Sequence, residues 1–280
     1  MIKLIHGSNI QSKIENERNE ANKALLSEIH GEYKNWLQKI EKLKGKSDDA
    51  SINQRVLDLN SYKNFIDQQK FKKEQGNLNG FTSQSKLHST VLEEFMHHLL
   101  IEIPKLNGKN LNFGPTNAYS NLYFSPKDLD SFENDSGLTI NTKDQDYAIS
   151  KEIKITTSLN SSSKVENKNI YVPVVSIECK TYLDKTMYEG SVATAEKIKR
   201  GNPYSLFLIV TETYEVDHSV DPQYSEIDQI YILRKSSQRS LPRHDIYADV
   251  VIDLFKTVES HLNSDWQNVS ARIASGRVIK

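Results

Sequence analysis

The sequence predicts an α/β (α+β) fold, in which a β-sheet is flanked by helices and preceded by an N-terminal helical arm. The sheet is predicted by short, nearly continuous apolar runs that end at Lys180 and Val210, because strands buried on both faces have this composition. A helical pattern separates the two runs, and this order implies a right-handed parallel crossover. The arm is predicted by apolar residues that step by three and four between Leu26 and Leu43.

The first 80 residues are rich in charge and have helical periodicity. The stepping apolar residues form the seam of a helix that packs lengthwise on a partner. A second apolar stripe, from Ile52 to Phe65, predicts a returning helix, so we favour a hairpin packed on the rest of the chain over an intermolecular coiled coil. The chain is accordingly divided into an arm, residues 1–80, and a core, residues 81–280.

A helix is predicted to open the core over residues 85–100. At about 100° per residue, Glu94 lies on the same side as the apolar Leu87 and Val91, whereas Glu93 falls well away from them. Glu94 is therefore expected to face inward, and the alternative is a surface acid at the edge of the apolar stripe. Residues 107–135, rich in Asn, Ser, Gly and Pro, are predicted to form a long irregular loop.

A carboxylate and an ammonium group are expected together at the end of the strand Tyr171–Lys180. Side chains alternate between the two faces of a strand, so Glu178 and Lys180 point into the same cleft. Such a pair at the end of a buried run is costly unless the charges pair or bind an ion, which indicates a functional site. The alternative is a surface ion pair at a strand end. Glu-x-Lys also occurs in less suitable contexts, which begin at Glu32, Glu152 and Glu166.

A second carboxylate is expected from the segment Asp144-Gln-Asp146, which is typical of a turn that leads into another strand. Asp146 stands at the strand entrance and is the first candidate, with Asp144 on the same face as the reserve. Carboxylate oxygens suit Mg²⁺, which typically binds one or two of them together with phosphate and water. The alternative is that both aspartates are simply turn residues.

These residues carry a family resemblance. An acid at a strand start, a connecting hairpin and a strand that ends Ile-Glu-Cys-Lys resemble the PD-(D/E)xK nuclease core, in which the same helical crossover follows. More narrowly, Tyr171–Leu183 together with Leu206–Thr211 is similar to the BbvCI-like Type II restriction endonucleases. The chain departs from the family pattern in having Gln145 where a proline often precedes the aspartate.

The resemblance implies a restriction-endonuclease-like mixed β-sheet and a Mg²⁺-dependent endonuclease. Such an enzyme hydrolyses DNA at a specific short double-stranded sequence and leaves 5'-phosphate ends. Asp146 and Glu178 would be the metal ligands. Lys180 would orient or help deprotonate the attacking water, and Glu94 would be an accessory acid that positions a water at the metal.

The resemblance also implies a second subunit. BbvCI-like enzymes join two different subunits that read an asymmetric sequence, so this chain is expected to be one half of an enzyme. A homodimer on a palindromic site is the alternative. The arm at residues 1–80 would contribute to DNA recognition or subunit contact.

The net charge of -1 and the pI near 6.7 do not indicate nucleic-acid binding by the molecule as a whole, so local basic clusters must supply it. One run without acids, over residues 234–243, is expected to contact DNA phosphates, and the alternative is a solvated loop. The loop at residues 107–135 is a candidate DNA clamp. The basic residues of the run are Arg234, Lys235, Arg239 and Arg243.

No apolar stretch approaches the roughly 18 residues needed to span a bilayer, and the first residues lack a signal-peptide core, so a soluble, cytoplasmic protein is expected. The single cysteine, Cys179, excludes an internal disulfide framework and is consistent with a reducing compartment. Strand alternation places Cys179 on the face opposite Glu178 and Lys180, so we interpret it as a small buried hydrophobe and not as a nucleophile.

Two other functions are compatible with the same residues. A DNA repair or recombination nuclease on this core would cut branched or damaged DNA regardless of sequence. A non-catalytic DNA-binding partner subunit, in which Glu178 and Lys180 form only an ion pair, would cleave no substrate. Metal-dependent cleavage of plasmid DNA, followed by sequencing of the ends, distinguishes these functions from site-specific restriction.

Overall fold

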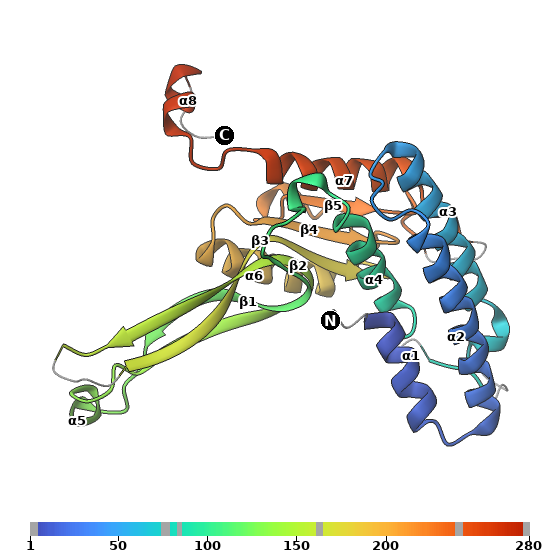
Figure 1. The fold of residues 1–280 in the computed structure, drawn as a ribbon, viewed down its shortest axis with the longest axis horizontal. Helices are drawn as coiled ribbons and strands as arrows, with labels where there is room; N and C mark the ends of the chain where they lie inside the picture. Colours follow the sequence, from blue (N-terminus) through green and yellow to red (C-terminus); the bar gives the residue numbers. More distant parts are fainter. Residues whose placement is uncertain (1–4, 74–78, 83–85, 161–164, 239–242, 277–280) are drawn as a thin grey trace.

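The computed structural model describes residues 5–73, 79–82, 86–160, 165–238 and 243–276 of the 280-residue chain. A mixed five-stranded β-sheet lies at its centre (Figure 1). The strands are β1 (Asn112–Phe124), β2 (Leu138–Ser158), β3 (Val165–Lys180), β4 (Leu206–Thr211) and β5 (Gln229–Ile232), and they lie in this order in the sheet. β1, β2 and β3 are antiparallel neighbours, whereas β4 and β5 continue the sheet in parallel with β3.

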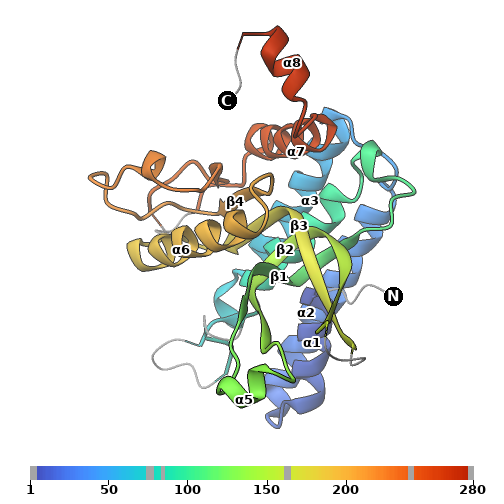
Figure 2. The same ribbon diagram turned by 90° about the vertical axis from the view of Figure 1, so that its left-hand side faces the viewer.

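Helices cover both faces of the sheet (Figures 1 and 2). They are α1 (Ile5–Asn16), α2 (Glu20–Glu41), α3 (Asp49–Ile66), α4 (Ser89–Leu100), α5 (Leu129–Phe132), α6 (Lys185–Gly201), α7 (Ala248–Asn263) and α8 (Val269–Ala274), with 3-10 turns η1 (Gln69–Phe71), η3 (Pro104–Leu106) and η4 (Pro222–Tyr224). α1 to α4 and α7 share one cluster of buried side chains with one face of the sheet, and α6 covers the other face. The predicted parallel crossover is confirmed, because α6 joins β3 to the parallel β4. None of the helices in the described ranges is both long and apolar enough to cross a membrane.

The predicted N-terminal hairpin is present, since α2 packs against α3. Asn19 and Asp48 begin these two helices as N-caps, because their side-chain oxygens accept hydrogen bonds from backbone N–H groups of the first turn. One continuous cluster of buried side chains runs from Ile10 in α1 to Val258 in α7, so the arm shares its core with the sheet. The buried seam of α2 consists of Leu26, Ile29, Tyr33, Trp36 and Ile40, as predicted.

The β1–β2 hairpin, with α5 at its turn, projects away from the helices (Figure 1), and we call residues 112–145 the β-arm. The prediction of an irregular loop at residues 107–135 is wrong, because much of this segment forms β1. β1 is solvated along most of its length, so polar residues replace the apolar alternation that identifies a half-buried strand.

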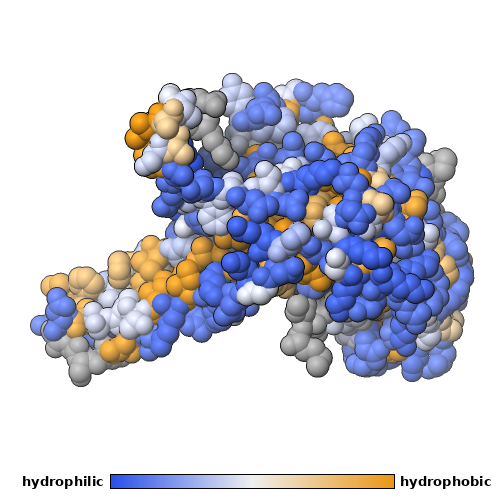
Figure 3. All heavy atoms as spheres, turned by 45° about the horizontal axis from the view of Figure 1, so that its top comes forward, coloured by the Kyte–Doolittle hydropathy of each residue, from blue (hydrophilic) through white to orange (hydrophobic). Residues whose placement is uncertain are grey.

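Apolar side chains are exposed around the turn of the β-arm. Phe124, Leu129 and Phe132 have exposed fractions of 58%, 83% and 48%. Figure 3 shows apolar surface along this projection. Clustered exposed apolar residues of this kind mark interaction sites more often than isolated ones do.

Asn60 joins the N-terminal arm to the core by two reciprocal hydrogen bonds. Its Nδ2 donates to the carbonyl oxygen of Ile246 (2.9 Å), and its Oδ1 accepts from the N–H of the same residue (2.8 Å). Both residues are buried. The backbone of the segment that precedes α7 therefore depends on a side chain of α3 for its hydrogen bonds.

Asn60→Ala is expected to lower the free energy of unfolding by about 2–4 kcal/mol, because it leaves the N–H and C=O of Ile246 buried without a partner. Asn64→Ala, one turn later, removes an exposed side chain whose hydrogen bond to Asp245 is long (3.4 Å). It is expected to cost less than about 0.5 kcal/mol. Urea unfolding measures both variants, and equal losses would contradict the coupling of arm and core through Asn60.

Candidate active site

The middle of β2 and the end of β3 bring the two predicted carboxylates and the lysine together, and we call Asp146, Glu178 and Lys180 the strand-end cluster. The antiparallel β2–β3 ladder ends just before Asp146 and Glu178, which follow it on opposite strands. Nζ of Lys180 lies 2.7 Å from Oε2 of Glu178 and 3.1 Å from Oδ2 of Asp146. Oδ2 of Asp146 also accepts a 2.8 Å hydrogen bond from the backbone N–H of Cys179, which holds the carboxylate against β3.

A β-bulge interrupts β2 beside Asp146, so the aspartate that the sequence predicted at a strand entrance lies inside a longer strand. Opposite Gly114 to Thr116 of β1, β2 contains one more residue than β1 does. The bulge interrupts the alternation of side chains, and Nε2 of Gln145 lies 3.4 Å from Oε1 of Glu178. Strict alternation would have turned Gln145 away from the face of Asp146, so this contact could not be predicted from the strand pattern. Oε1 of Gln145 is buried and has no hydrogen-bond partner in the part of the chain that the structure describes.

The protonation of this cluster follows from burial and pairing. Burial disfavours the charged form of Lys180, but Glu178 and Asp146 outweigh burial and raise its pKa, so the ammonium group stays charged at neutral pH. Burial raises the pKa of Glu178, while Lys180 opposes this effect and Asp146 adds to it. Burial also raises the pKa of the Cys179 thiol, which is consistent with a buried hydrophobe and not with a nucleophile.

Glu93 of α4 is a third carboxyl group that acts on this cluster, although helical periodicity had placed it well away. Burial raises the pKa of Glu93 to about 7, and the charge of Asp146 adds to this effect. Lys180 acts in the opposite direction, so Glu93 is electrostatically coupled to both strand ends. A carboxyl group that titrates near neutral pH beside another carboxylate is typical of a functional site.

Glu94 is buried as predicted, but it faces the N-terminal arm. Its Oε2 accepts hydrogen bonds from the N–H groups of His6 (2.8 Å) and Gly7 (3.2 Å), and its Oε1 accepts one from the hydroxyl of Tyr33 (2.6 Å). Although burial opposes its charge, interactions with His98 and Tyr33 lower the pKa of Glu94. Both oxygens are committed to α1 and α2, so the structure does not place Glu94 where the predicted accessory acid would act.

Asp144 also lies apart from the cluster. It is exposed and lines a separate cavity of about 560 Å³ together with Thr116 and Tyr171. Of the two aspartates that the sequence left open, Asp146 is the one that the structure places beside Lys180.

Arg234 is buried, so the prediction that it contacts DNA is wrong. Its Nε lies 2.7 Å from Oε2 of Glu212, and Oε1 of Glu212 lies 2.6 Å from Nζ of Lys63 in α3. The three side chains are at most 2% exposed. A buried carboxylate requires paired charge, and Arg234 serves this purpose within the fold.

The other basic residues of the run are also engaged with the protein. Lys235 is exposed and pairs with Asp249, and Nη1 of Arg243 lies 3.2 Å from Oδ2 of Asp67. Arg239 lies outside the described residues. The described basic residues of the run therefore all pair with carboxylates of the protein, and a DNA contact by Lys235, Arg239 or Arg243 stays a prediction.

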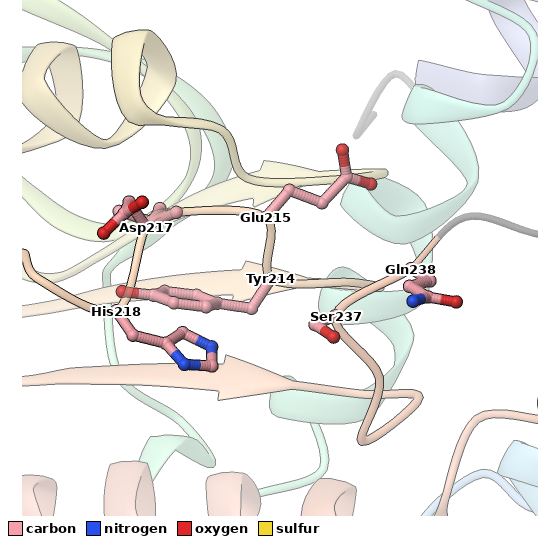
Figure 4. Close-up of a pocket in the computed structure, with 7 residues that line it drawn as sticks. Tyr214, Glu215, Asp217, His218, Ser237 and Gln238 are labelled. Carbon is pink, nitrogen blue, oxygen red and sulfur yellow. The ribbon is translucent and has the colours of Figure 1, made fainter.

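A surface hollow of about 700 Å³ lies beside the loop that follows β4 (Figure 4). Tyr214, Glu215, Asp217 and His218 are among the residues that line it. Glu215 points away from Asp217 and His218 in Figure 4, so these side chains do not converge on one position. The strand-end cluster remains the candidate active site.

The strand-end cluster has the donor chemistry of a site for a hard divalent cation. Asp146 and Glu178 present oxygens to the position that the ammonium group of Lys180 fills, and the unpartnered amide oxygen belongs to the adjacent Gln145. Among the described residues, no three or more His, Cys, Asp or Glu side chains lie close enough together to hold a metal ion. Two carboxylates suit Mg²⁺, which takes its remaining ligands from substrate and water.

Comparison with known proteins identifies the family. The family model described as Bpu10I restriction endonuclease matches residues 84–250, which is more than half of the chain and includes both strand ends. The chain belongs to the Bpu10I restriction endonuclease family. A solved structure described as "native BbvCI A2B2 tetramer at low resolution" is similar, with a TM-score of 0.70 and 18% sequence identity over 92% of this chain and 96% of that chain. No curated protein matches the sequence.

Membership in the Bpu10I family confirms the predicted resemblance to BbvCI-like restriction endonucleases. The likeness to BbvCI confirms the fold class, a mixed sheet flanked by helices. The match to the family model begins near the start of α4 and leaves the N-terminal arm outside. The function of the arm therefore stays a prediction.

Asp146→Asn is expected to lower the pKa of Glu93 from about 7, because it removes a negative charge that repels the Glu93 carboxylate more strongly than Glu178 does. The pKa should stay above that of an ordinary glutamate, since burial remains. ¹³C NMR of carboxyl-labelled glutamate measures the titration, with Glu93→Gln to assign the signal. Asp144→Asn, two residues earlier on the strand, is the matched control, and an equal shift in both variants would show that Asp146 does not act directly on Glu93.

Proposed function

We propose that this chain is a Type II restriction endonuclease, or one subunit of such an enzyme, that hydrolyses DNA at a specific short double-stranded sequence with Mg²⁺ and leaves 5'-phosphate ends. The observation that carries the proposal is the contact of Lys180 with both Asp146 and Glu178, where β2 passes the end of β3. This arrangement occurs in a member of a restriction endonuclease family. It has the chemistry of the PD-(D/E)xK nucleases that the sequence resembles.

Asp146 and Glu178 would hold the cation between the middle of β2 and the end of β3. When bound, Mg²⁺ supplies charge neutralisation at the scissile phosphate and lowers the pKa of water. The hydrogen bond from Cys179 N–H fixes Asp146, so this ligand is positioned by the backbone before the cation arrives. Glu178 is positioned by Gln145 and Lys180.

Lys180 would stabilise the negative charge that develops on the phosphate in the transition state. Its raised pKa favours this role over removal of a proton from water, because the ammonium group is the populated form. Glu93 is better suited to accept that proton. With a pKa of about 7, its carboxyl group exchanges a proton readily at neutral pH. We therefore assign to Glu93 the accessory role that the sequence suggested for Glu94.

A second subunit would dock on the β-arm. Leu129 and Phe132 lie exposed at the turn of the β-arm, where burial against another chain would remove apolar surface from water. The similar BbvCI structure is described as an A2B2 tetramer. Assembly of this kind would supply the second site that double-strand cleavage requires.

Glu178→Gln and Lys180→Met are each expected to slow Mg²⁺-dependent cleavage by at least about 100-fold, since each removes a charge that acts on the phosphate or its cation. The measurement is single-turnover cleavage of plasmid DNA by the complete enzyme, followed by sequencing of the ends. Asp144→Asn is expected to retain activity, because its side chain is exposed outside the cluster.

The products of the same assay separate the alternatives. A half-enzyme purified alone should nick plasmid weakly, whereas a homodimer should linearise it. Full activity of both variants in the complete enzyme would identify the chain as a non-catalytic partner subunit. Cleavage at branches without sequence preference would instead favour a repair or recombination nuclease.

The double substitution Leu129→Asp with Phe132→Asp is expected to weaken assembly, because it places charge on the surface that would be buried. Analytical ultracentrifugation measures the loss, and circular dichroism confirms an unchanged fold. Val269→Asp with Ile273→Asp on α8 is the control, since these residues are also exposed (52% and 63%). Dissociation by the α8 pair and not by the β-arm pair would place the subunit contact elsewhere.

A further inference from the structure

A cavity of about 420 Å³ lies beside the end of β3, between the end of α3, the start of α4 and the chain that follows Lys180. Its lining contrasts with the acidic strand-end cluster, because cationic side chains and hydroxyl groups predominate, and we call it the basic pocket. The residues that decide its chemistry are Lys72, Lys73, His88, Ser89, Thr181 and Arg243.

Positive charge exceeds negative charge in the basic pocket. Asp67 contributes a carboxylate to the lining. Its Oδ2 lies 3.2 Å from Nη1 of Arg243, and its Oδ1 lies 4.0 Å from Nζ of Lys72. Nδ1 of His88 lies 3.6 Å from the same carboxylate. Burial lowers the pKa of His88 to about 4, so its imidazole is neutral at pH 7. Exposed Lys73 adds a further cation, and the pocket therefore attracts an anion.

The basic pocket adjoins the strand-end cluster along two elements. Thr181 and Tyr182 line the pocket and directly follow Lys180, and two residues of chain span at most about 7 Å. Ser89 lines the pocket one helical turn before Glu93, and residues four apart share a face of a helix. Each nucleotide advances about 3.4 Å along the axis of B-DNA, and successive phosphates of one winding strand lie further apart than this rise. A backbone that passes the acids therefore meets the pocket about one or two nucleotides away.

We propose that the basic pocket binds a backbone phosphate of the DNA strand that is cut, about one to three nucleotides from the scissile bond. This inference rests on the proposed nuclease function. Lys73 pairs directly with the phosphate. Arg243 and Lys72, which contact Asp67 in this structure, shift partly from Asp67 to the phosphate. Hydroxyl groups such as those of Ser89 and Thr181 donate to phosphate oxygens. The contact sets the position of the strand relative to the acids, because phosphate contacts fix register but carry no base information.

Methylphosphonate substitution, which removes the charge of one phosphate at a time, identifies the contact. DNA duplexes substituted along the flank of the cut bond are bound to the complete enzyme in EDTA, and affinity is measured by gel mobility shift. At one position the neutral linkage is expected to weaken binding by wild type several-fold and to weaken binding by Lys73→Gln distinctly less, because this variant has already lost one of the cationic contacts to that phosphate. The slope of log Kd against log salt should fall by about one unit in Lys73→Gln.

Lys197→Gln is the matched control for the loss of one positive charge. Lys197 is exposed on α6, which covers the other face of the sheet, so its salt slope should equal that of wild type. Asp67→Asn tests the pocket by the removal of a negative charge instead of a positive one. Removal of the competing carboxylate should tighten DNA binding, whereas a purely structural role for Asp67 predicts weaker binding and a lower melting temperature.

Cleavage by wild type distinguishes a failure of the pocket assignment from a failure of the proposed nuclease function. Lys73→Gln is expected to raise the DNA concentration for half-maximal single-turnover rate by more than it lowers the maximal rate. If wild type cleaves DNA but no methylphosphonate position depends on Lys73, the pocket assignment is overturned and the nuclease function stands. If wild type cleaves no DNA with any partner subunit, both are overturned.

Discussion

The structure depends on the balance of charge where β2 passes the end of β3. Asp146 and Glu178 adjoin the last residue pair of the β2–β3 ladder on opposite strands, and two half-buried carboxylates that both contact one ammonium group would repel each other without it. Lys180 supplies that ammonium group, and both carboxylates raise its pKa in return. The arrangement requires one register of the β2–β3 ladder, because a slip by one residue would turn Glu178 and Lys180 to the opposite face. The β-bulge beside Gln145 adds a further reference point for that register.

The N-terminal arm supports this strand end without contributing a residue to it. The backbone N–H of Glu212 donates to the carbonyl oxygen of Lys180 (3.1 Å), so the first residue after β4 continues the pairing beside the lysine. Lys63 of α3 and Arg234 together neutralise the buried side chain of Glu212 and lower its pKa against the effect of burial. Removal of one partner from a buried ion cluster leaves uncompensated charge. Displacement of α3 would therefore disturb the pairing beside Lys180.

Sequence reasoning succeeded where the signal was local and failed where packing decided the outcome. Glu178 and Lys180 could be found because strand alternation over a few residues places them together. Glu94 is buried as predicted but faces the N-terminal arm, because α4 is buried on nearly all sides, between that arm and the sheet, so its apolar stripe does not reveal which neighbour each face meets. Arg234 was predicted to be exposed because its own segment contains no acid, whereas its partner comes from the end of another strand. β1 was missed because a solvated strand has no apolar alternation.

The same packing explains how a chain with a net charge of -1 could attract both a divalent cation and a polyanion. The strand-end acids and the basic pocket lie on adjoining parts of α4 and β3, within about one Debye length of each other at physiological salt. At long range their fields largely cancel, so the molecule lacks a strong field to steer DNA. At short range each charged group acts on its own ligand. A cation bound by Asp146 would lie closer to Asp146 than to the phosphate, and a phosphate bound by Lys73 would lie closer to Lys73 than to the cation. In the proposed enzyme, affinity for DNA would therefore depend on short-range fit to the strand-end cluster and the basic pocket.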